Sequence, residues 1–167
     1  MYDAVLAGCR WLENTPWGVT VRDSPWMYPV VLWIHFIGLS IWLGTGLTID
    51  LRLMGVGARR QTAFELSNDL SAWSWTGFAV AFLGGFLLLS AEATTYVTNT
   101  GFRLKLAVLT PLALMCHLVV QSNTRAWTQT EPTSAMGKWA GLIELLLWIL
   151  VVTASVDFLL TNAVTRP

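Results

Sequence analysis

The longest stretch of the chain without a charged residue runs from Ser24 to Ile49. It holds no Asp, Glu, Lys or Arg across 26 residues. A helix of that length rises about 39 Å, which exceeds the ~30 Å hydrocarbon core of a bilayer. The stretch therefore predicts a transmembrane helix, which we place at about residues 25–53.

Amino-acid composition supports a membrane protein and excludes one class of partner. Hydrophobic residues make up 54% of the chain and charged residues only 12%, about half the share in soluble domains. The formal net charge is zero and no run of basic residues occurs, so no nucleic-acid partner is expected. Ten tryptophans suit a chain whose indole rings collect at the two lipid–water interfaces. The lipid bilayer is the first partner that the sequence predicts.

Further apolar segments complete the predicted fold, an all-α integral membrane protein with four helices in an up-down bundle. The 22 residues between Asp69 and Glu92 carry no charge, nor do the 19 between Lys105 and Arg125. Pro111 falls inside the third helix and predicts a kink there. The later helices are expected at about 70–91, 102–124 and 138–160, with polar connections at 55–69, 94–101 and 128–134.

The first 24 residues form a lead-in segment rather than a membrane span. Apolar residues at helical spacing predict a short helix over 2–12, and the run from Asn14 to Gly18 then breaks it. Trp11 and Trp17 favour a segment that lies in the headgroup layer; a disordered tail is the alternative. No basic start with an apolar core and cleavage site occurs, so a cleaved signal peptide is not expected.

An even number of spans places both termini on one side of the membrane. Basic residues divide evenly between the two sides, so the positive-inside rule does not choose an orientation. The protein is expected in a bacterial inner membrane. If Arg103 and Lys105 belong to the bundle rather than to a loop, its termini are periplasmic. The terminal side then keeps Arg10, Arg22 and Arg166, against Arg52, Arg59, Arg60, Arg125 and Lys138 on the other side.

Two histidines lie inside predicted membrane helices, where an ionisable side chain marks a candidate site. His35 is expected about 15 Å and His117 about 22 Å below the terminal-side surface. Tilt and the kink at Pro111 can absorb that difference. Because paired imidazoles hold b-type haem inside helix bundles, we predict that the two histidines are metal ligands of one haem b. Ordinary hydrogen bonding between helices is the alternative.

Other residues are candidates for holding such a cofactor. Gly38 lies on the face of His35 and would leave space for a flat macrocycle, on which Trp42 would stack. Arg103 and Lys105 are candidate partners of the propionates. The alternative for the glycine and the tryptophan is helix packing, and for the two basic residues it is an interfacial position with the charge held in water.

Glu144 is the carboxylate expected at the depth of His117, about 9 Å against about 12 Å from the opposite surface. It would accept a hydrogen bond from the imidazole and fix its tautomer, or relay protons near a quinone. A plain interhelical hydrogen bond is the alternative. Asp50 and Arg52 are interpreted as structural residues at the membrane boundary.

Several other kinds of chemistry find no support in the sequence. Met115, Cys116 and His117 all suit Cu(I), but adjacent helical residues point about 100° apart and do not converge. CxxCH, CxxC and HExxH patterns are absent, as are the GxSxG and P-loop motifs of hydrolytic enzymes. A catalytic site is therefore not predicted, and the chain is expected to move electrons, protons or ions for a partner.

A pattern of motifs resembles a group of small bacterial four-helix membrane proteins of unknown function. The resemblance covers the helical region but not the first twenty residues, and it implies a shared fold. A more distant similarity links the chain to copper-resistance D-type proteins and to transmembrane b-type cytochromes. The motifs are Tyr28-Pro29, His35, Gly38, Asp50-Leu51-Arg52-Leu53, Gly55, and Phe102 with Lys105.

These observations favour a cytochrome-b-like membrane subunit. It would bind haem b, and quinone as a second candidate ligand, and would pass electrons between a partner redox protein and the quinone pool. Imidazole also ligates the magnesium of a pigment, so the metal of the tetrapyrrole stays open. The alternatives are a cofactor-free anchor or scaffold subunit of a larger complex and a transporter of copper or another ion.

Overall fold

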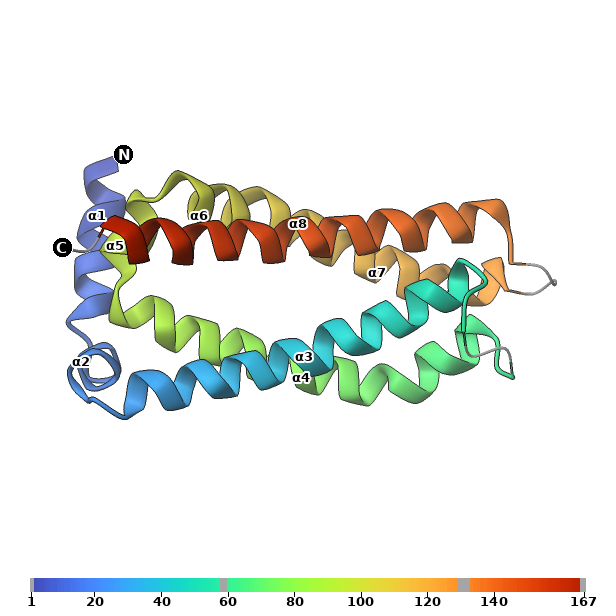
Figure 1. Cartoon of the computed structure of the whole chain (residues 1–167), viewed down its shortest axis with the longest axis horizontal. Coiled ribbons are helices and arrows are strands. Elements are labelled where there is room, and N and C mark those ends of the chain that lie inside the picture. Colours follow the sequence, from blue (N-terminus) through green and yellow to red (C-terminus); the bar gives the residue numbers. More distant parts are fainter. Residues whose placement is uncertain (1, 58–59, 129–132, 166–167) are drawn as a thin grey trace.

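The chain folds into a bundle of long helices (Figure 1). A computed structural model describes residues 2–57, 60–128 and 133–165, with side chains through Ser155. Four apolar helical spans in this part of the chain are long enough to cross a membrane. No strand occurs within the described residues. The prediction of an all-α, four-helix integral membrane bundle is confirmed. The spans are α3 (Met27–Leu53), α4 (Ala63–Ala91), Thr100–Trp127, and α8 (Ala135–Thr165).

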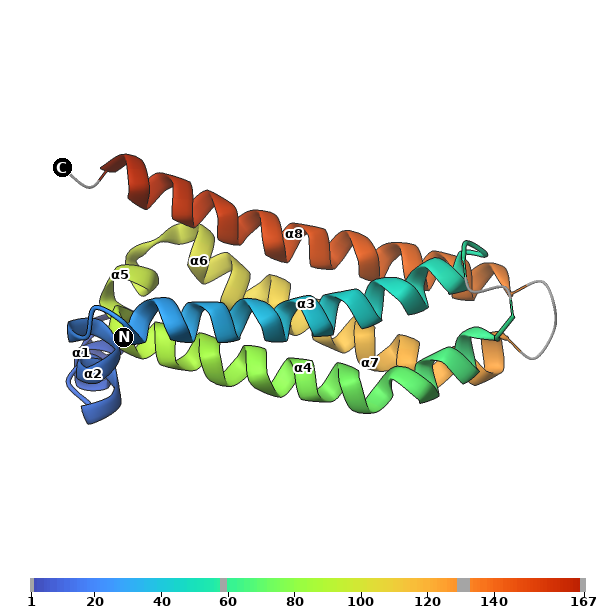
Figure 2. The ribbon, with the colours of Figure 1, turned by 60° about the horizontal axis from the view of Figure 1, so that its bottom comes forward.

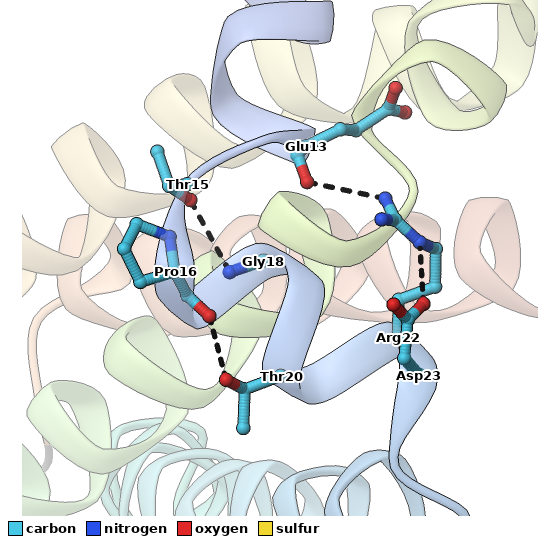
Figure 3. A network of polar contacts seen from close by, with 7 residues as sticks. All are labelled: Glu13, Thr15, Pro16, Gly18, Thr20, Arg22 and Asp23. Carbon is cyan, nitrogen blue, oxygen red and sulfur yellow. Dashed lines mark hydrogen bonds and ion pairs between the residues drawn. The ribbon is translucent and has the colours of Figure 1, made fainter.

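Two short helices, α1 (Tyr2–Glu13) and α2 (Pro16–Asp23), lie across one end of the bundle. The predicted break is present at Asn14 and Thr15, but Pro16 opens a new helix rather than extending the break. Proline suits the first helical position, and Thr15 Oγ1 accepts a hydrogen bond from the Gly18 amide at 3.3 Å (Figure 3). Arg22 Nη1 donates to the Glu13 carbonyl at 3.2 Å and ties the two helices together.

The second span starts earlier than the sequence predicts. We expected a polar connection through Asp69, whereas α4 begins at Ala63. Thr62 accepts from the Glu65 amide at 3.2 Å while the Glu65 carboxylate accepts from the Thr62 amide at 2.8 Å. This reciprocal pair is a capping box, which starts a helix in polar sequence that the apolar run does not reveal. Arg52 Nε donates to the Gln61 carbonyl at 2.6 Å across the connection.

The third span is irregular where the sequence predicts a kink. The expected loop at 94–101 is largely helical, because Asn99 Oδ1 accepts from the Phe102 amide at 2.9 Å and caps a new helix. Pro111 has no amide hydrogen to donate and crowds the preceding turn, and a π-helix precedes it. The pieces are α5 (Ala93–Thr98), α6 (Thr100–Leu104), the π-helix η1 (Lys105–Leu109) and α7 (Thr110–Trp127).

Helices α3 and α4 run antiparallel and pack closely over much of their length (Figure 2). Glycines permit the approach: a methyl group added to Gly77 would lie 2.7 Å from the Trp42 backbone nitrogen. One added to Gly84 would lie 2.9 Å from the Cβ atom of His35. Both ends of the described chain lie at the same end of the bundle as α1 and α2 (Figure 1). The four spans therefore alternate in direction, as the up-down prediction requires.

Candidate functional site

The bundle buries an acid–imidazole pair between its last two spans. His117 comes from α7 and Glu144 from α8, and their residues are 4% and 1% exposed. The Nδ1 atom of His117 lies 2.5 Å from Oε1 of Glu144. The sequence predicted this hydrogen bond from the similar depths of the two residues. A contact this short is typical of the strong hydrogen bonds that a carboxyl group makes.

A third titratable side chain, Asp50, joins the pair from α3. It is 1% exposed, and its carboxyl group is close enough to that of Glu144 to share a hydrogen bond. The helix backbones meet here, since a methyl group added to Gly141 would lie 3.1 Å from the Asp50 carbonyl. Helical side chains lean toward their own amino terminus, so on these antiparallel helices Asp50 and Glu144 lean toward each other.

The polar atoms of this site are incompletely bonded. Within the described part of the chain, Asp50 Oδ1, Glu144 Oε2, His117 Nε2 and Ser74 Oγ are buried without a hydrogen-bond partner. A hydrogen bond between two carboxyl groups needs one proton, because an ionised carboxylate only accepts. One proton shared between Asp50 and Glu144 would supply the missing donor. The arrangement is therefore built to hold at least one exchangeable proton away from water.

Aromatic rings enclose the imidazole of His117. The ring of Trp42 lies 4.4 Å from it, centroid to centroid, and that of Trp75 lies 6.1 Å away. Trp42 also contacts Phe78 at 4.9 Å and Trp148 at 5.8 Å. These contacts fix the ring orientation and keep bulk water from its unbonded Nε2 atom.

The second histidine lies elsewhere in the bundle. His35 Nδ1 donates to the Ala81 carbonyl at 2.7 Å, which leaves Nε2 as the atom with the free lone pair. Trp42, the α3 residue against His117, follows His35 by seven residues, or about 10 Å along the helix axis. The structure therefore does not bring the two imidazoles together, and one haem bound by both stays a prediction.

The other predicted cofactor residues have different surroundings. The α4 backbone at Gly77 and Ala81 fills the space beside Gly38. No room remains there for even a methyl group, which favours the alternative of helix packing. The interpretation of Gly38 as clearance for a macrocycle stays a prediction. Trp42 lies against His117, with the two ring planes tilted by 56°, rather than on a free surface near His35.

The two basic candidates lie near the terminal end of the bundle. Arg103 is exposed and its Nη2 donates to Thr100 Oγ1 at 3.0 Å. Lys105 is half-buried, with Nζ 5.7 Å from the centroid of the Phe102 ring, and lies within electrostatic range of His35. Lys105 therefore lies near His35, and neither Arg103 nor Lys105 contacts the pair of Glu144 and His117. Within the described residues no group of three or more His, Cys, Asp or Glu side chains is arranged to hold a metal ion.

From the sequence we interpreted Asp50 as a structural residue and did not predict that it lies beside Glu144. The missed signal is depth: Asp50 lies three residues before the end of α3 and Glu144 nine residues after the start of α8. Both therefore lie in the half of the bundle that carries the 54–62 connection.

Comparison with known proteins gives no match to a protein-family model, to a curated protein or to a solved structure.

Proposed function

We propose that this chain transfers protons inside the membrane through a relay of Asp50, Glu144 and His117. The observation that carries the proposal is the series of contacts from Asp50 to Glu144 and from Glu144 to His117, which joins three helices. Among the described residues, Arg52 is the one other buried side chain that carries a charge. Ionisable residues at such positions are costly and are typical of proton paths. The same side chains would weaken the bundle if they served packing alone.

The relay has a direction from the connections toward the middle of the bundle. Asp50 lies about 5 Å from the end of its helix, and Glu144 and His117 lie about 14–15 Å from the same end of theirs. A proton would enter on Asp50 and pass to Glu144 along their shared hydrogen bond. Glu144 would then break its O–H bond as His117 Nδ1 forms an N–H bond. These two transfers run between side chains that the structure brings together. The imidazolium would hold the proton until an acceptor reaches Nε2, which has no hydrogen-bond partner here.

Proton flux into liposomes tests the proposal. Purified protein would be reconstituted around a pH-sensitive dye, with a potassium diffusion potential as the driving force. We expect flux above that of empty liposomes and a loss of about tenfold or more in Glu144→Gln, which keeps the shape but removes the proton carrier. The control is Glu65→Gln, since glutamine also completes a capping box. Flux that Glu144→Gln leaves unchanged, or wild-type flux equal to that of empty liposomes, would overturn the proposal.

A second candidate is the electron-transfer function expected from the sequence, with haem b on His35. What supports it is the tautomer of His35, whose Nδ1 is held by a carbonyl so that Nε2 carries a lone pair. Half-buried Lys105 lies within electrostatic range and suits a propionate. His117 fits less well as the other ligand, because Trp42 and Trp75 lie against its ring. When bound, the haem would supply one-electron chemistry between a partner redox protein and the quinone pool.

The visible absorption spectrum separates this candidate from the relay. A Soret band that sharpens on reduction with dithionite and disappears in His35→Ala would support haem binding. A colourless, folded preparation from cells supplied with haem precursor would exclude it. A cofactor-free anchor is the function left if both the Soret band and the proton flux are absent.

We further propose that the protein lies in a bacterial inner membrane with its termini in the periplasm. Exposed Arg103 and half-buried Lys105 belong to a membrane span, and leaving them out puts the basic excess on the side of the 54–62 connection. Asp50 would then receive protons from the cytoplasm. Alkaline phosphatase fused after residue 167 should be active, and a fusion at 128 should be inactive. The reverse result would invert the orientation.

A further inference from the structure

A cavity of about 220 Å³ opens beside the proposed relay, between α3 and α8. Leu47 and Ile149 at its rim are 42% and 51% exposed, so in a membrane this rim meets lipid rather than water. Leu145 and Val152 continue its apolar lining. A molecule dissolved in the bilayer can therefore reach the cavity from the side.

The lining contains one ionisable residue, Asp50. Its Oδ1 atom is buried without a hydrogen-bond partner, and its carboxyl group contacts Glu144, which in turn contacts His117. Thr153 also lines the cavity, and its hydroxyl oxygen can accept a bond while it donates to Ile149. The polar side of this otherwise apolar cavity thus lies at one end of the proposed relay of Asp50, Glu144 and His117.

The size and lining of the cavity accommodate a ring. The indole of Trp148 forms one wall and is held by an edge contact with Trp42 at 5.8 Å. A cavity of about 150 Å³ admits benzene, so this one accommodates a substituted six-membered ring. A carboxyl group has two oxygens, so Asp50 can share a proton with Glu144 through one and bond a ring oxygen through the other. An acyl chain would leave that second oxygen without a partner.

We propose that this cavity binds the head ring of a lipid-soluble quinone or quinol, with a ring oxygen hydrogen-bonded to the Asp50 carboxyl group. The inference rests on the proposed relay, for which it names the class of molecule that gives or takes the proton. It concerns binding and hydrogen bonding, and no electron transfer is assigned to this chain.

Photolabelling of the full chain in lipid nanodiscs tests the site. The probe is an azido-substituted ubiquinone with a short side chain, and mass spectrometry locates the labelled peptides. We expect label on α3 and α8 around Leu47 and Trp148, displaced by excess ubiquinone-1. Leu47→Trp places a large ring in the cavity and should lower the labelling by about tenfold or more. Leu118→Trp is the matched control, because Leu118 is exposed to a similar extent, 46%, but lies on α7 outside the lining.

Three outcomes overturn the quinone site. Label spread evenly over α7 and α8 would show that the probe only partitions into lipid. Displacement by oleate as effective as that by ubiquinone-1 would show an acyl-chain groove. Glu144→Gln separates this proposal from the relay, because it should abolish proton flux and leave the labelling in place. Flux without labelling would overturn the quinone site alone, and labelling without flux would overturn the relay alone.

Discussion

At the scale of single residues, the contact between Asp50 and Glu144 has a direct spectroscopic consequence. Two carboxyl groups joined by a hydrogen bond hold a proton between them, and the infrared carbonyl band of a protonated carboxyl should be present at neutral pH. Asp50→Asn and Glu144→Gln should each shift the frequency of that band, because the amide that replaces one carboxyl group changes the hydrogen bond of the other.

The control for this measurement is Asp69→Asn, which changes an exposed acid that accepts a hydrogen bond from Gln61 at 3.0 Å. It should leave the band unchanged. A wild-type spectrum without the band, or a band at an unchanged frequency in both single variants, would contradict the shared proton.

Gly38 gives a second prediction at this scale. A methyl group at this position would overlap the backbone of α4 at Ala81 and Gly77, and backbone atoms cannot move aside as a flexible side chain can. Gly38→Ala should therefore cost about 1–3 kcal/mol through overpacking. Thermal unfolding in detergent measures the effect.

Gly44→Ala is the matched variant on the same helix. A methyl group there meets nothing within 4 Å, and alanine favours a helix over glycine by about 1 kcal/mol. We expect unchanged or higher stability. Equal melting temperatures for the two variants would show that α3 and α4 are not in close backbone contact at Gly38.

Individual residues were predictable where a pattern fixed their depth. The pairing of His117 with Glu144 followed from counting helical rises to the two positions, since both lie in regular helix on either side of one connection. The position of His35 relative to His117 did not follow, because the π-helix before Pro111 and the tilt of the helices are set by packing. Asp50 was missed because an acid near a helix end is usually an interfacial residue.

At the scale of helices, the capping box of α4 decides where that span begins. Thr62→Ala removes the acceptor of the Glu65 amide and should cost about 0.5–2 kcal/mol. The effect should be local, with faster hydrogen exchange in the first turn of α4. Thr76→Ala is the matched control, since its hydroxyl donates to the Ala72 carbonyl of its own helix at 2.7 Å and makes no cap.

If exchange in the first turn of α4 were the same in Thr62→Ala and Thr76→Ala, the early start of the helix would not depend on the box. The capping box also explains why the start of α4 was predicted too late, at about residue 70. Apolar runs locate the membrane-crossing part of a helix, and caps locate its true ends. The start of α4 at Ala63 and the helical turns at 93–104 are both governed by side-chain oxygens that accept from backbone amides.

At the scale of the whole molecule, the long apolar runs determined the number and direction of the spans. Each of the four spans is long and apolar enough to cross a membrane, so only a helix can satisfy its backbone there, and the up-down bundle followed. The chain order leaves open which helices pack most closely. Glycines on matching faces make α3 and α4 a closely packed pair. Helix α8 approaches α3 at Gly141, close to the contact between Asp50 and Glu144.

The attachment of α1 and α2 across the bundle end gives the last prediction. Glu13 Oε1 accepts from the Thr94 amide at 2.6 Å and Oε2 accepts from the Thr94 hydroxyl at 3.0 Å. The carboxylate thereby links α1 to the first turn of α5, whose amides have no partner within the helix. Glu13→Ala should cost about 1 kcal/mol of local stability by leaving the half-buried Thr94 amide unpaired. Hydrogen exchange over Tyr2–Glu13 should then accelerate while exchange in α3 stays unchanged. Asp3→Ala, at an exposed acid on the same helix, should leave both rates as they are. Equal exchange in the two variants would mean that the amino-terminal helices are held by their apolar contacts with the bundle and the membrane surface rather than by this carboxylate.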